Sequence, residues 1–193
     1  DDLVGVLRLF LANRSVLEAL DGGWNLLQKP LRRLHHFLNR DTIAQSKKNI
    51  AAHYDLGNDF FSLFLDPTMS YSGGVFVTPE DSMEQASINK FEAICRKLDL
   101  KPSDEVIEIG TGWGGFAMYA AEHYGCHVTT TTISEEQFAY ADEEITRRGL
   151  GGRITLLKDD YRQLRGQYDK LVSIEMIEAV GLAYLPLFFQ TCS

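Results

Sequence analysis

The clearest sign of a binding site in this chain is a short apolar segment followed directly by several glycines. Residues 105–109 read Glu-Val-Ile-Glu-Ile, and Gly110-Thr-Gly-Trp-Gly-Gly115 follows directly. The β-branched residues predict a buried strand, and the helix formers at 116–121 predict a helix after the glycines. Strand, glycine turn and helix in this order are typical of the first βα unit of a Rossmann-like sheet, where glycines allow a nucleoside to approach the backbone. The pattern alone suits NAD, FAD or S-adenosylmethionine equally well.

Acidic residues distinguish these cofactors. In dinucleotide enzymes an acid about 20 positions after the glycines binds the ribose hydroxyls. The predicted second strand, residues 126–133, carries no acid, which counts against NAD. Glu108 instead lies two residues before the first glycine. That placement is common in S-adenosylmethionine methyltransferases, where the acid holds the loop or the methionine end. The alternative for Glu108 is a strand-end residue that only caps the loop.

Composition limits the class of protein. The 193 residues are 45% hydrophobic, which suits one globular domain with an extension. No apolar run approaches the roughly 18 residues that a membrane span needs. The N-terminal residues lack the pattern of a signal peptide. The cysteines are scattered in no metal-ligand spacing, so we expect reduced thiols, no metal site and a cytoplasmic location. They are Cys95, Cys126 and Cys192.

The charge is unevenly distributed. Residues 1–50 hold eight Lys and Arg against five Asp and Glu, whereas residues 51–193 hold eleven against twenty-two. The acidic body argues against nucleic acid as a partner. The basic stretch, interleaved with Leu and Phe, could rest on anionic lipid at the inner face of a membrane, or it could be a solvated helix face. Its cations are Lys29, Arg32, Arg33, Arg40, Lys47 and Lys48.

The pattern of apolar residues predicts a helical N-terminal extension at residues 1–50 and an α/β domain at residues 51–193. The position of Glu108 before the glycines indicates that this domain is a methyltransferase domain. Within the extension we expect helices at 2–21 and 22–50. Within the domain we expect an irregular aromatic-rich stretch at 51–80, helices at 81–100 and from Ser134 to Gly149, and further strands at 153–157 and 171–174.

The predicted sheet is unfinished. The fold class is α/β, a Rossmann-like class I methyltransferase sheet with its first four strands present and its C-terminal strands missing. An unpaired fourth strand would expose an edge that invites aggregation. We therefore expect the chain to be a fragment.

Several segments together resemble the cyclopropane-fatty-acid synthases and their relatives, the mycolic-acid cyclopropane synthases. The resemblance runs from about residue 49 to the C-terminus, and the combination is far more specific than any one segment. The segments are His53–Asn58, Leu65–Pro67, Tyr71-Ser72, Gly112–Gly115, Thr132–Ser134 with Gln137, Asp160–Arg162 and Ser173–Glu178.

The resemblance implies a site for S-adenosylmethionine. Tyr71 and Ser72 match the pair that closes over the methionine part. The glycine turn matches the loop beneath the carboxypropyl chain and ribose. Two of the matched residues have a second interpretation, Gln137 as a helix cap and Tyr161 as a core aromatic. The matched residues are Tyr71, Ser72, Gly110, Thr111, Gly112, Thr132, Ile133, Gln137, Tyr161 and Arg162, to which we add Glu108.

The resemblance also implies a reaction. The sulfonium methyl is attacked by a cis double bond of a phospholipid acyl chain, and loss of a proton from the new methyl closes a cyclopropane ring. The implied base is bicarbonate, held by Glu178, by a His and a Tyr that the resemblance places beyond residue 193, and by backbone N–H groups, among which we place that of Gly73. An apolar site with aromatic faces would protect the carbocation. The nearby aromatics are Tyr54, Phe60, Phe61, Phe64, Tyr71 and Phe76, each of which could also be ordinary core.

Other functions stay open at this point. One is methyl transfer without ring closure, to a lipid carbon or to a small amine. Another is an inactive lipid- or protein-binding module. For Glu178 the alternative is a solvated carboxylate after the fourth strand. A homodimer is left open as the assembly.

Overall fold

The computed structural model describes residues 3–14 and 57–193. The chain divides into two compact units, residues 1–40 and 41–193. In the first unit, helix α1 (Leu3–Ala12) falls within the predicted helix at 2–21. None of the helices in the described ranges is long and apolar enough to span a membrane. The predicted helix at 22–50, the boundary after residue 50, Tyr54 and the cations Lys29, Arg32, Arg33, Arg40, Lys47 and Lys48 lie outside these ranges.

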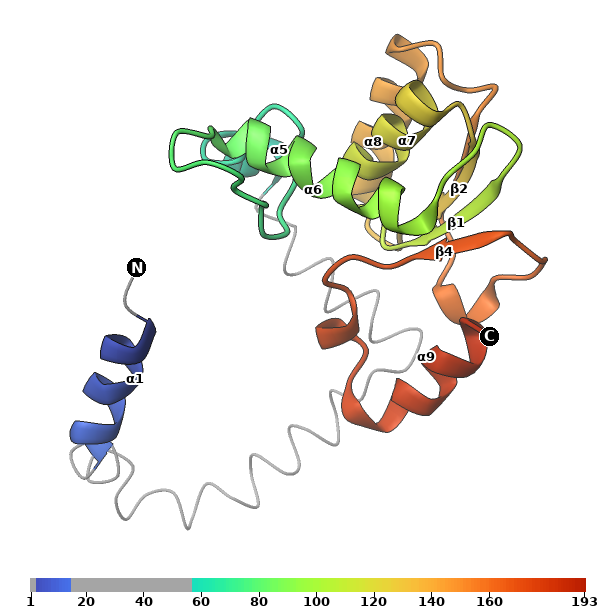
Figure 1. The fold of residues 1–193 in the computed structure, drawn as a ribbon. Helices are drawn as coiled ribbons and strands as arrows, with labels where there is room; N and C mark the ends of the chain where they lie inside the picture. The colour runs from blue at the N-terminus through green and yellow to red at the C-terminus, as the bar shows by residue number, and fades with distance from the viewer. Residues whose placement is uncertain (1–2, 15–56) are drawn as a thin grey trace. The chain divides into compact units, whose positions relative to one another are not determined.

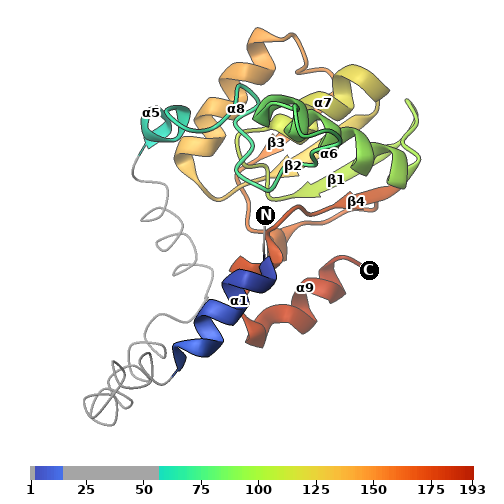
Figure 2. The same ribbon diagram turned by 60° about the vertical axis from the view of Figure 1, so that its left-hand side comes forward.

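A four-stranded parallel sheet forms the centre of the second unit, as the sequence predicted. Its order is β3-β2-β1-β4, so β1 is paired on both sides and β4 lies beside β1 instead of β3 (Figure 2). Among the described residues β4 has one strand neighbour, and the strands expected after it stay a prediction. The strands are β1 (Glu105–Ile109), β2 (His127–Thr131), β3 (Ile154–Leu157) and β4 (Lys170–Val172).

Helices cover both faces of this sheet (Figure 1). Alternation along β1 divides the core, since Val106 packs with residues of α6, α7 and α8, whereas Ile107 and Ile109 pack with Phe188 of α9. Three 3₁₀ turns connect the later elements. The helices are α6 (Met83–Leu98), α7 (Gly115–Tyr124), α8 (Glu135–Arg147) and α9 (Leu185–Thr191), and the turns are η1 (Tyr161–Gln163), η2 (Ile177–Ala179) and η3 (Leu182–Tyr184).

Two predicted helix starts are confirmed by their caps. Ser82 accepts a hydrogen bond from the backbone N–H of Gln85 at 3.1 Å, and Ser134 accepts one from the N–H of Gln137 at 3.3 Å. These bonds satisfy N–H groups that the first turn of a helix leaves without a partner. Helix α8 ends at Arg147, two residues before the predicted stop at Gly149, which has φ +68°.

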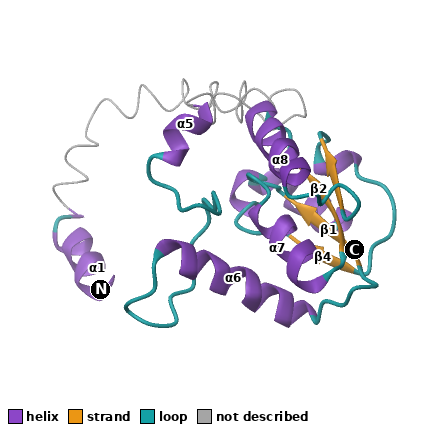
Figure 3. Ribbon diagram, turned by 90° about the horizontal axis from the view of Figure 1, so that it is seen from above, coloured by secondary structure: helices purple, strands orange, loops and turns teal. Residues whose placement is uncertain are grey.

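The structure corrects two predicted elements. The stretch 51–80 was expected to be irregular, but it contains a short helix, α5 (Gly57–Ser62), which a long loop joins to α6 (Figure 3). Phe61 of α5 is buried against Trp113 of the glycine turn, at 4.9 Å between ring centroids. The fourth strand stops at Val172, short of the predicted Ile174, and the chain then turns at Glu175, which takes φ +48°.

The close approach of the loop before α6 to the start of α7 yields a prediction for Gly115. A Cβ on Gly115 would lie 2.8 Å from the backbone oxygen of Thr68 and 3.1 Å from Phe91. We expect Gly115→Ala to lower the free energy of unfolding by about 1–3 kcal/mol, although alanine favours helices. Urea unfolding would measure it. Gly151→Ala, which meets nothing within 4 Å, is the control, and equal stabilities would contradict the prediction.

Candidate functional site

An opening lies where the carboxyl ends of the strands meet. It is a cavity of about 620 Å³, lined by the segments that follow β1, β2, β3 and β4 and by residues 69–72. Because the strand order reverses between β1 and β4, the loops after these two strands leave in opposite directions and open a crevice. Ligands of open α/β sheets bind in such crevices.

The structure brings the predicted site residues together at this cavity. Glu178, the predicted holder of the base, lines it, whereas Gly73 does not line it directly. Each predicted cofactor residue also lines it: Tyr71, Ser72, Glu108, Gly110, Thr111, Gly112, Thr132, Ile133, Gln137, Tyr161 and Arg162.

The glycine turn has a backbone that needs glycine. Gly110, Gly112 and Gly114 have φ of +99°, +53° and +90°, values that side chains with a Cβ rarely adopt. A Cβ on Gly112 would meet nothing within 4 Å, so this glycine borders open space at the cavity. The next residue, Trp113, fixes the turn, because its ring is buried and its Nε1–H donates to Asn58 at 2.7 Å.

Glu108 lies beneath the turn and is buried at 2% exposure. The hydroxyl of Thr130 donates to its carboxyl at 2.6 Å, and the hydroxyl of Thr111 lies 2.7 Å from that of Thr130. Burial raises the pKa of Glu108 to about 8. The predicted acid is therefore linked to the turn through two threonines, and it is protonated at neutral pH.

Gln137 lies in the capped first turn of α8 and also lines the cavity. Its backbone N–H is capped by Ser134, and its side-chain oxygen accepts from Thr132 at 2.9 Å. Its amide nitrogen makes no hydrogen bond to a described residue, and the side chain lines the cavity. The side chain of Gln137 does not cap the helix, because the N–H of Ser134 donates to the hydroxyl of Thr132 at 3.2 Å instead.

The segment after β3 holds a buried ion pair. Asp160, at 2% exposure, accepts from the guanidinium of Arg162 at 2.6 and 2.7 Å, and this bonding raises the pKa of Arg162. Arg162 also lies over the rings of Tyr161 and Tyr184. Tyr161 packs against Phe188 of α9 and lines the cavity as well. The charge of Arg162 is therefore already balanced within the protein. Asp160 is a cavity residue to which the sequence alone assigned no role.

Lys90 of α6 lies buried beneath the loop that carries Tyr71 and Ser72. Its ammonium donates to the hydroxyl and carbonyl oxygens of Ser72, at 2.7 and 3.2 Å, and to Ser70. Burial lowers the pKa of Lys90, while the carboxylates of Asp66 and Glu175 act in the opposite direction. Lys90 therefore positions the loop from below. Nothing in the sequence marked it, because it looks like an ordinary helix lysine.

Glu175 is a second residue that the sequence reasoning passed over. Its carboxylate accepts the backbone N–H of Gly73 at 2.9 Å, and its side chain lines the cavity. A non-glycine residue at φ +48° stores strain on the order of 1–3 kcal/mol. Such strain persists where surrounding contacts enforce it, as the bond to Gly73 does here.

Of the predicted aromatics within the described ranges, the structure places Tyr71 at the cavity. Phe60, Phe61 and Phe64 instead form an edge-to-face cluster at and after α5, and Phe76 is exposed. The other aromatic rings at the cavity are those of Trp113, Phe91, Phe116 and Tyr161.

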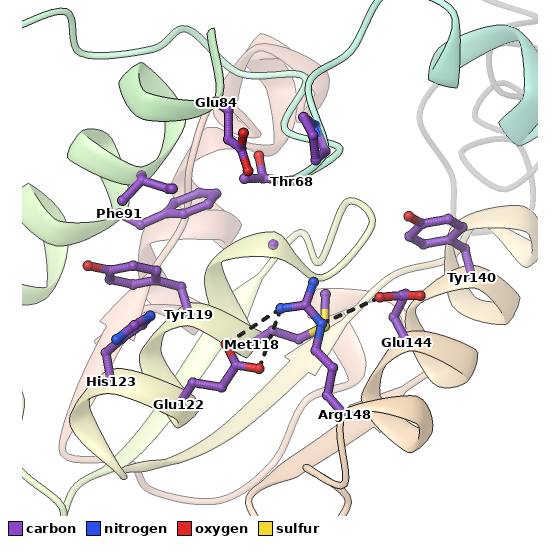
Figure 4. Close-up of a pocket in the computed structure, with 13 residues that line it drawn as sticks. Thr68, Glu84, Phe91, Met118, Tyr119, Glu122, His123, Tyr140, Glu144 and Arg148 are labelled. Atoms are coloured by element: carbon purple, nitrogen blue, oxygen red, sulfur yellow. Dashed lines mark hydrogen bonds and ion pairs between the residues drawn. The ribbon is translucent and has the colours of Figure 1, made fainter. Parts of the chain in front are cut away.

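A second cavity of about 330 Å³ lies between α6, α7 and α8 (Figure 4). Arg148 reaches across it to Glu122 and Glu144, with ion pairs of 3.4 Å each. None of the predicted site residues lines this cavity, and Arg148 is paired with two of its carboxylates. We assign it a role in packing the three helices.

Comparison with known proteins identifies the family. A sequence model described as mycolic acid cyclopropane synthetase matches residues 41–193. The chain belongs to this family. The cyclopropane-fatty-acyl-phospholipid synthase of Escherichia coli K12 is 44% identical over 158 residues, which cover 76% of this chain and 40% of that protein. A probable fatty acid methyltransferase of Pseudomonas putida is 39% identical over 165 residues, covering 84% of this chain and 40% of that protein.

A solved structure of the mycolic acid cyclopropane synthetase family also matches. It is a crystal structure of the mycolic acid cyclopropane synthase CmaA1 with SAH and CTAB, which has a TM-score of 0.72 and 32% identity and covers 75% of this chain and 51% of that chain. The α/β class I methyltransferase fold is thus confirmed. The chain spans about 40% of the length of the two curated relatives.

The buried acid at the turn yields a prediction on pH. The pKa of folded Glu108, about 8, lies above its ordinary value of 4.5. Between about pH 5 and 8 the folded protein keeps a proton that the unfolded chain has released, so rising pH lowers the free energy of unfolding, by at most about 1.4 kcal/mol per pH unit. Glu108→Gln should remove this dependence. Urea unfolding of both proteins at several pH values measures it, and parallel curves would contradict it.

Proposed function

We propose that this chain forms the cofactor-binding part of an S-adenosylmethionine-dependent synthase that adds a methylene group across a cis double bond of a phospholipid acyl chain. The chain belongs to the cyclopropane synthetase family. The observation that carries the proposal is that its glycine turn borders, at Gly112, the open cavity at the carboxyl ends of the strands. The buried threonine-linked Glu108 supports it, since it holds that turn in place.

The residues present fit the cofactor. Open space at Gly112 provides room for the ribose and carboxypropyl chain, and the amide nitrogen of Gln137 offers a donor at the edge of the cavity. Tyr71 and Ser72 lie across from the turn, on the loop that Lys90 positions. When bound there, the cofactor would supply a methyl group as an electrophilic sulfonium.

The acceptor side of the cavity suits a hydrocarbon. Ile109, Ile174, Met176 and Val180 line it. Apolar walls exclude water, which would otherwise capture the carbocation that methyl transfer leaves on the acyl chain. Aromatic faces stabilise a cation by the attraction of the ring quadrupole.

Ring closure needs a base, and we place it at the end of the cavity near Glu178 and Gly73. Bicarbonate held by Glu178 stays a prediction of the resemblance. Glu178 is exposed and lines the cavity, so a small anion could reach it. The N–H of Gly73, the predicted donor to that anion, is bonded to Glu175 in this structure.

Contact with a membrane surface is part of the proposal, because the acyl chain is part of a phospholipid. Exposed apolar side chains lie on α5 and just after it, namely those of Phe60, Leu63 and Phe64. The basic residues predicted to attract anionic lipid lie outside the described ranges, so their role stays a prediction.

A second candidate is methyl transfer to a lipid carbon without ring closure. It is favoured by the Pseudomonas putida relative, which is named a probable fatty acid methyltransferase. The two functions share the cofactor site and differ in what happens to the carbocation.

Lipid analysis of cells that express the full-length protein tests the function. Cyclopropanation adds CH₂ and removes the double bond, so we expect acyl chains heavier by that unit that resist ozonolysis and show ring protons by NMR. A branched methyl group in place of the ring would support the second candidate. Unchanged lipids from a protein that does not bind S-adenosylmethionine would refute both.

The open turn predicts the effect of a side chain at Gly112. Gly112→Val should abolish S-adenosylmethionine binding by calorimetry, because the new side chain would fill the space that the ligand needs. Gly149→Val is the matched control, since Gly149 also has positive φ and open surroundings but lies outside the cavity. Loss of binding in both variants, or in neither, would contradict the placement of the cofactor.

A further inference from the structure

Lys90 of α6 is a buried cation with which no described carboxylate forms an ion pair. Lys90 is 6% exposed, and its ammonium donates to Ser70 Oγ at 2.5 Å, to Ser72 Oγ at 2.7 Å and to the carbonyl oxygen of Ser72 at 3.2 Å. Asp66 and Glu175 act on it only through longer-range electrostatics. Burying a charge is costly unless its partners compensate it, so a cation bonded to three neutral oxygens indicates that an anion completes the site.

The two serines above Lys90 keep hydroxyl protons that the lysine cannot use. Each serine Oγ accepts from the ammonium, which is a donor only. The two Oγ atoms lie 3.3 Å apart, so one hydroxyl can donate to the other, which uses one of the two protons. At least one O–H is therefore left without an acceptor among the described residues. Both Ser70 and Ser72 line the cavity, so a ligand bound there can accept it.

We propose that Lys90 is a positioning residue that selects the carboxylate of S-adenosylmethionine, by directing the hydroxyl of Ser72 toward it. The inference rests on the proposed function and concerns how the methionine end of the cofactor is recognised. Lys90 does not line the cavity itself, so it acts through Ser72 from behind the loop.

The bonds to Ser72 fix the direction of its hydroxyl. Lys90 holds this residue at two atoms, the carbonyl oxygen and Oγ, and so restrains both its backbone and its side chain. Because the ammonium donates to Oγ, the proton of the Ser72 hydroxyl must point away from Lys90. A hydroxyl that accepts from a cation is polarised and becomes a stronger donor in turn.

A carboxylate is the ligand group that suits this donor. It accepts through two oxygens and carries a negative charge, which a nearby ammonium stabilises. Arg162, a cation that lines the cavity, is already bonded to Asp160 at 2.6 and 2.7 Å. Lys90 therefore supplies positive charge behind the cavity wall that no described carboxylate neutralises by direct contact.

Asp66 makes the arrangement rigid without taking the ammonium from the serines. One of its carboxylate oxygens accepts the N–H of Thr68 and the other accepts the hydroxyl of Ser87 of α6, both at 2.8 Å. These bonds attach the start of the loop to the helix that carries Lys90. A donor held in place before binding loses less entropy when the ligand arrives.

Ligand selectivity separates this role from a purely structural one. Calorimetry on the full-length protein compares S-adenosylhomocysteine with S-adenosyl-3-thiopropylamine, which is the same molecule without its carboxylate. Lys90→Met removes the charge and the donors, whereas Lys90→Gln removes the charge and keeps an N–H donor. Lys97→Met is the matched control, because Lys97 is an exposed lysine of the same helix and lies outside the cavity. Urea unfolding checks that each variant folds.

We expect the wild-type protein and Lys97→Met to prefer S-adenosylhomocysteine by roughly tenfold or more, the usual effect of a hydrogen bond to a charged group. Both Lys90 variants should bind S-adenosylhomocysteine about tenfold more weakly and the amine at least as tightly as the wild-type protein does. Ser72→Ala should lose the same preference. Combining Ser72→Ala with Lys90→Gln should weaken binding little further, because both substitutions affect one contact.

Equal weakening of both ligands in Lys90→Gln would overturn the inference, because Lys90 would then only hold the loop. A Lys90→Gln variant with the wild-type preference would overturn it too. So would a Ser72→Ala variant that keeps the full preference for the carboxylate, even if neither Lys90 variant folds. If the wild-type protein binds neither S-adenosylmethionine nor S-adenosylhomocysteine, it is the proposed function that fails.

Discussion

The paired position of β1 governs the rest of this structure. Strands β2 and β4 both hydrogen-bond to β1, and the strand order reverses between β1 and β4. The chain that leaves β1 must therefore turn within a few residues at the carboxyl end of the sheet. The positive φ values at Gly110, Gly112 and Gly114 are the result of that constraint. A turn this tight leaves backbone without side chains facing the cavity, which is the surface that a nucleoside requires.

Neighbouring segments hold the turn and the opposite wall in place. Trp113 is fixed by Asn58 and Phe61 of α5, a segment more than fifty residues earlier in the chain. On the other wall, Lys90 of α6 holds Ser72 through its side chain and backbone. Buried polar groups of this kind are costly unless they are hydrogen-bonded, and each of these is. The cavity therefore has rigid walls on both sides of the predicted cofactor position.

The two carboxyl groups at this cavity have different environments. Glu108 is enclosed, and among the described residues a threonine hydroxyl is its one hydrogen-bond partner, so burial favours its protonated form near neutral pH. As a neutral group it serves to hold Thr130 and, through it, Thr111. Glu175 is exposed and accepts a backbone N–H, with Lys90 close enough to interact electrostatically. This pair thus comprises one buried carboxyl group and one exposed carboxylate.

The sequence by itself determined the elements whose signals are local. The β-branched run before the glycines, the Ser caps at 82 and 134 and the glycine pattern predicted β1, α6, α8 and the turn, and the matched motifs predicted the residues that line the cavity. Each of these signals depends on neighbours in the chain, such as side-chain alternation or a capping hydroxyl three residues away.

Only the tertiary structure decided how distant residues act together. Helix α5 forms where Phe61 can pack on Trp113, and after β4 the carboxylate of Glu175 accepts the N–H of Gly73, a contact 102 residues apart in the chain. Lys90 and Glu175 look like ordinary surface residues in the sequence. Their roles depend on burial and on backbone groups brought close by folding, and neither is encoded in a local pattern.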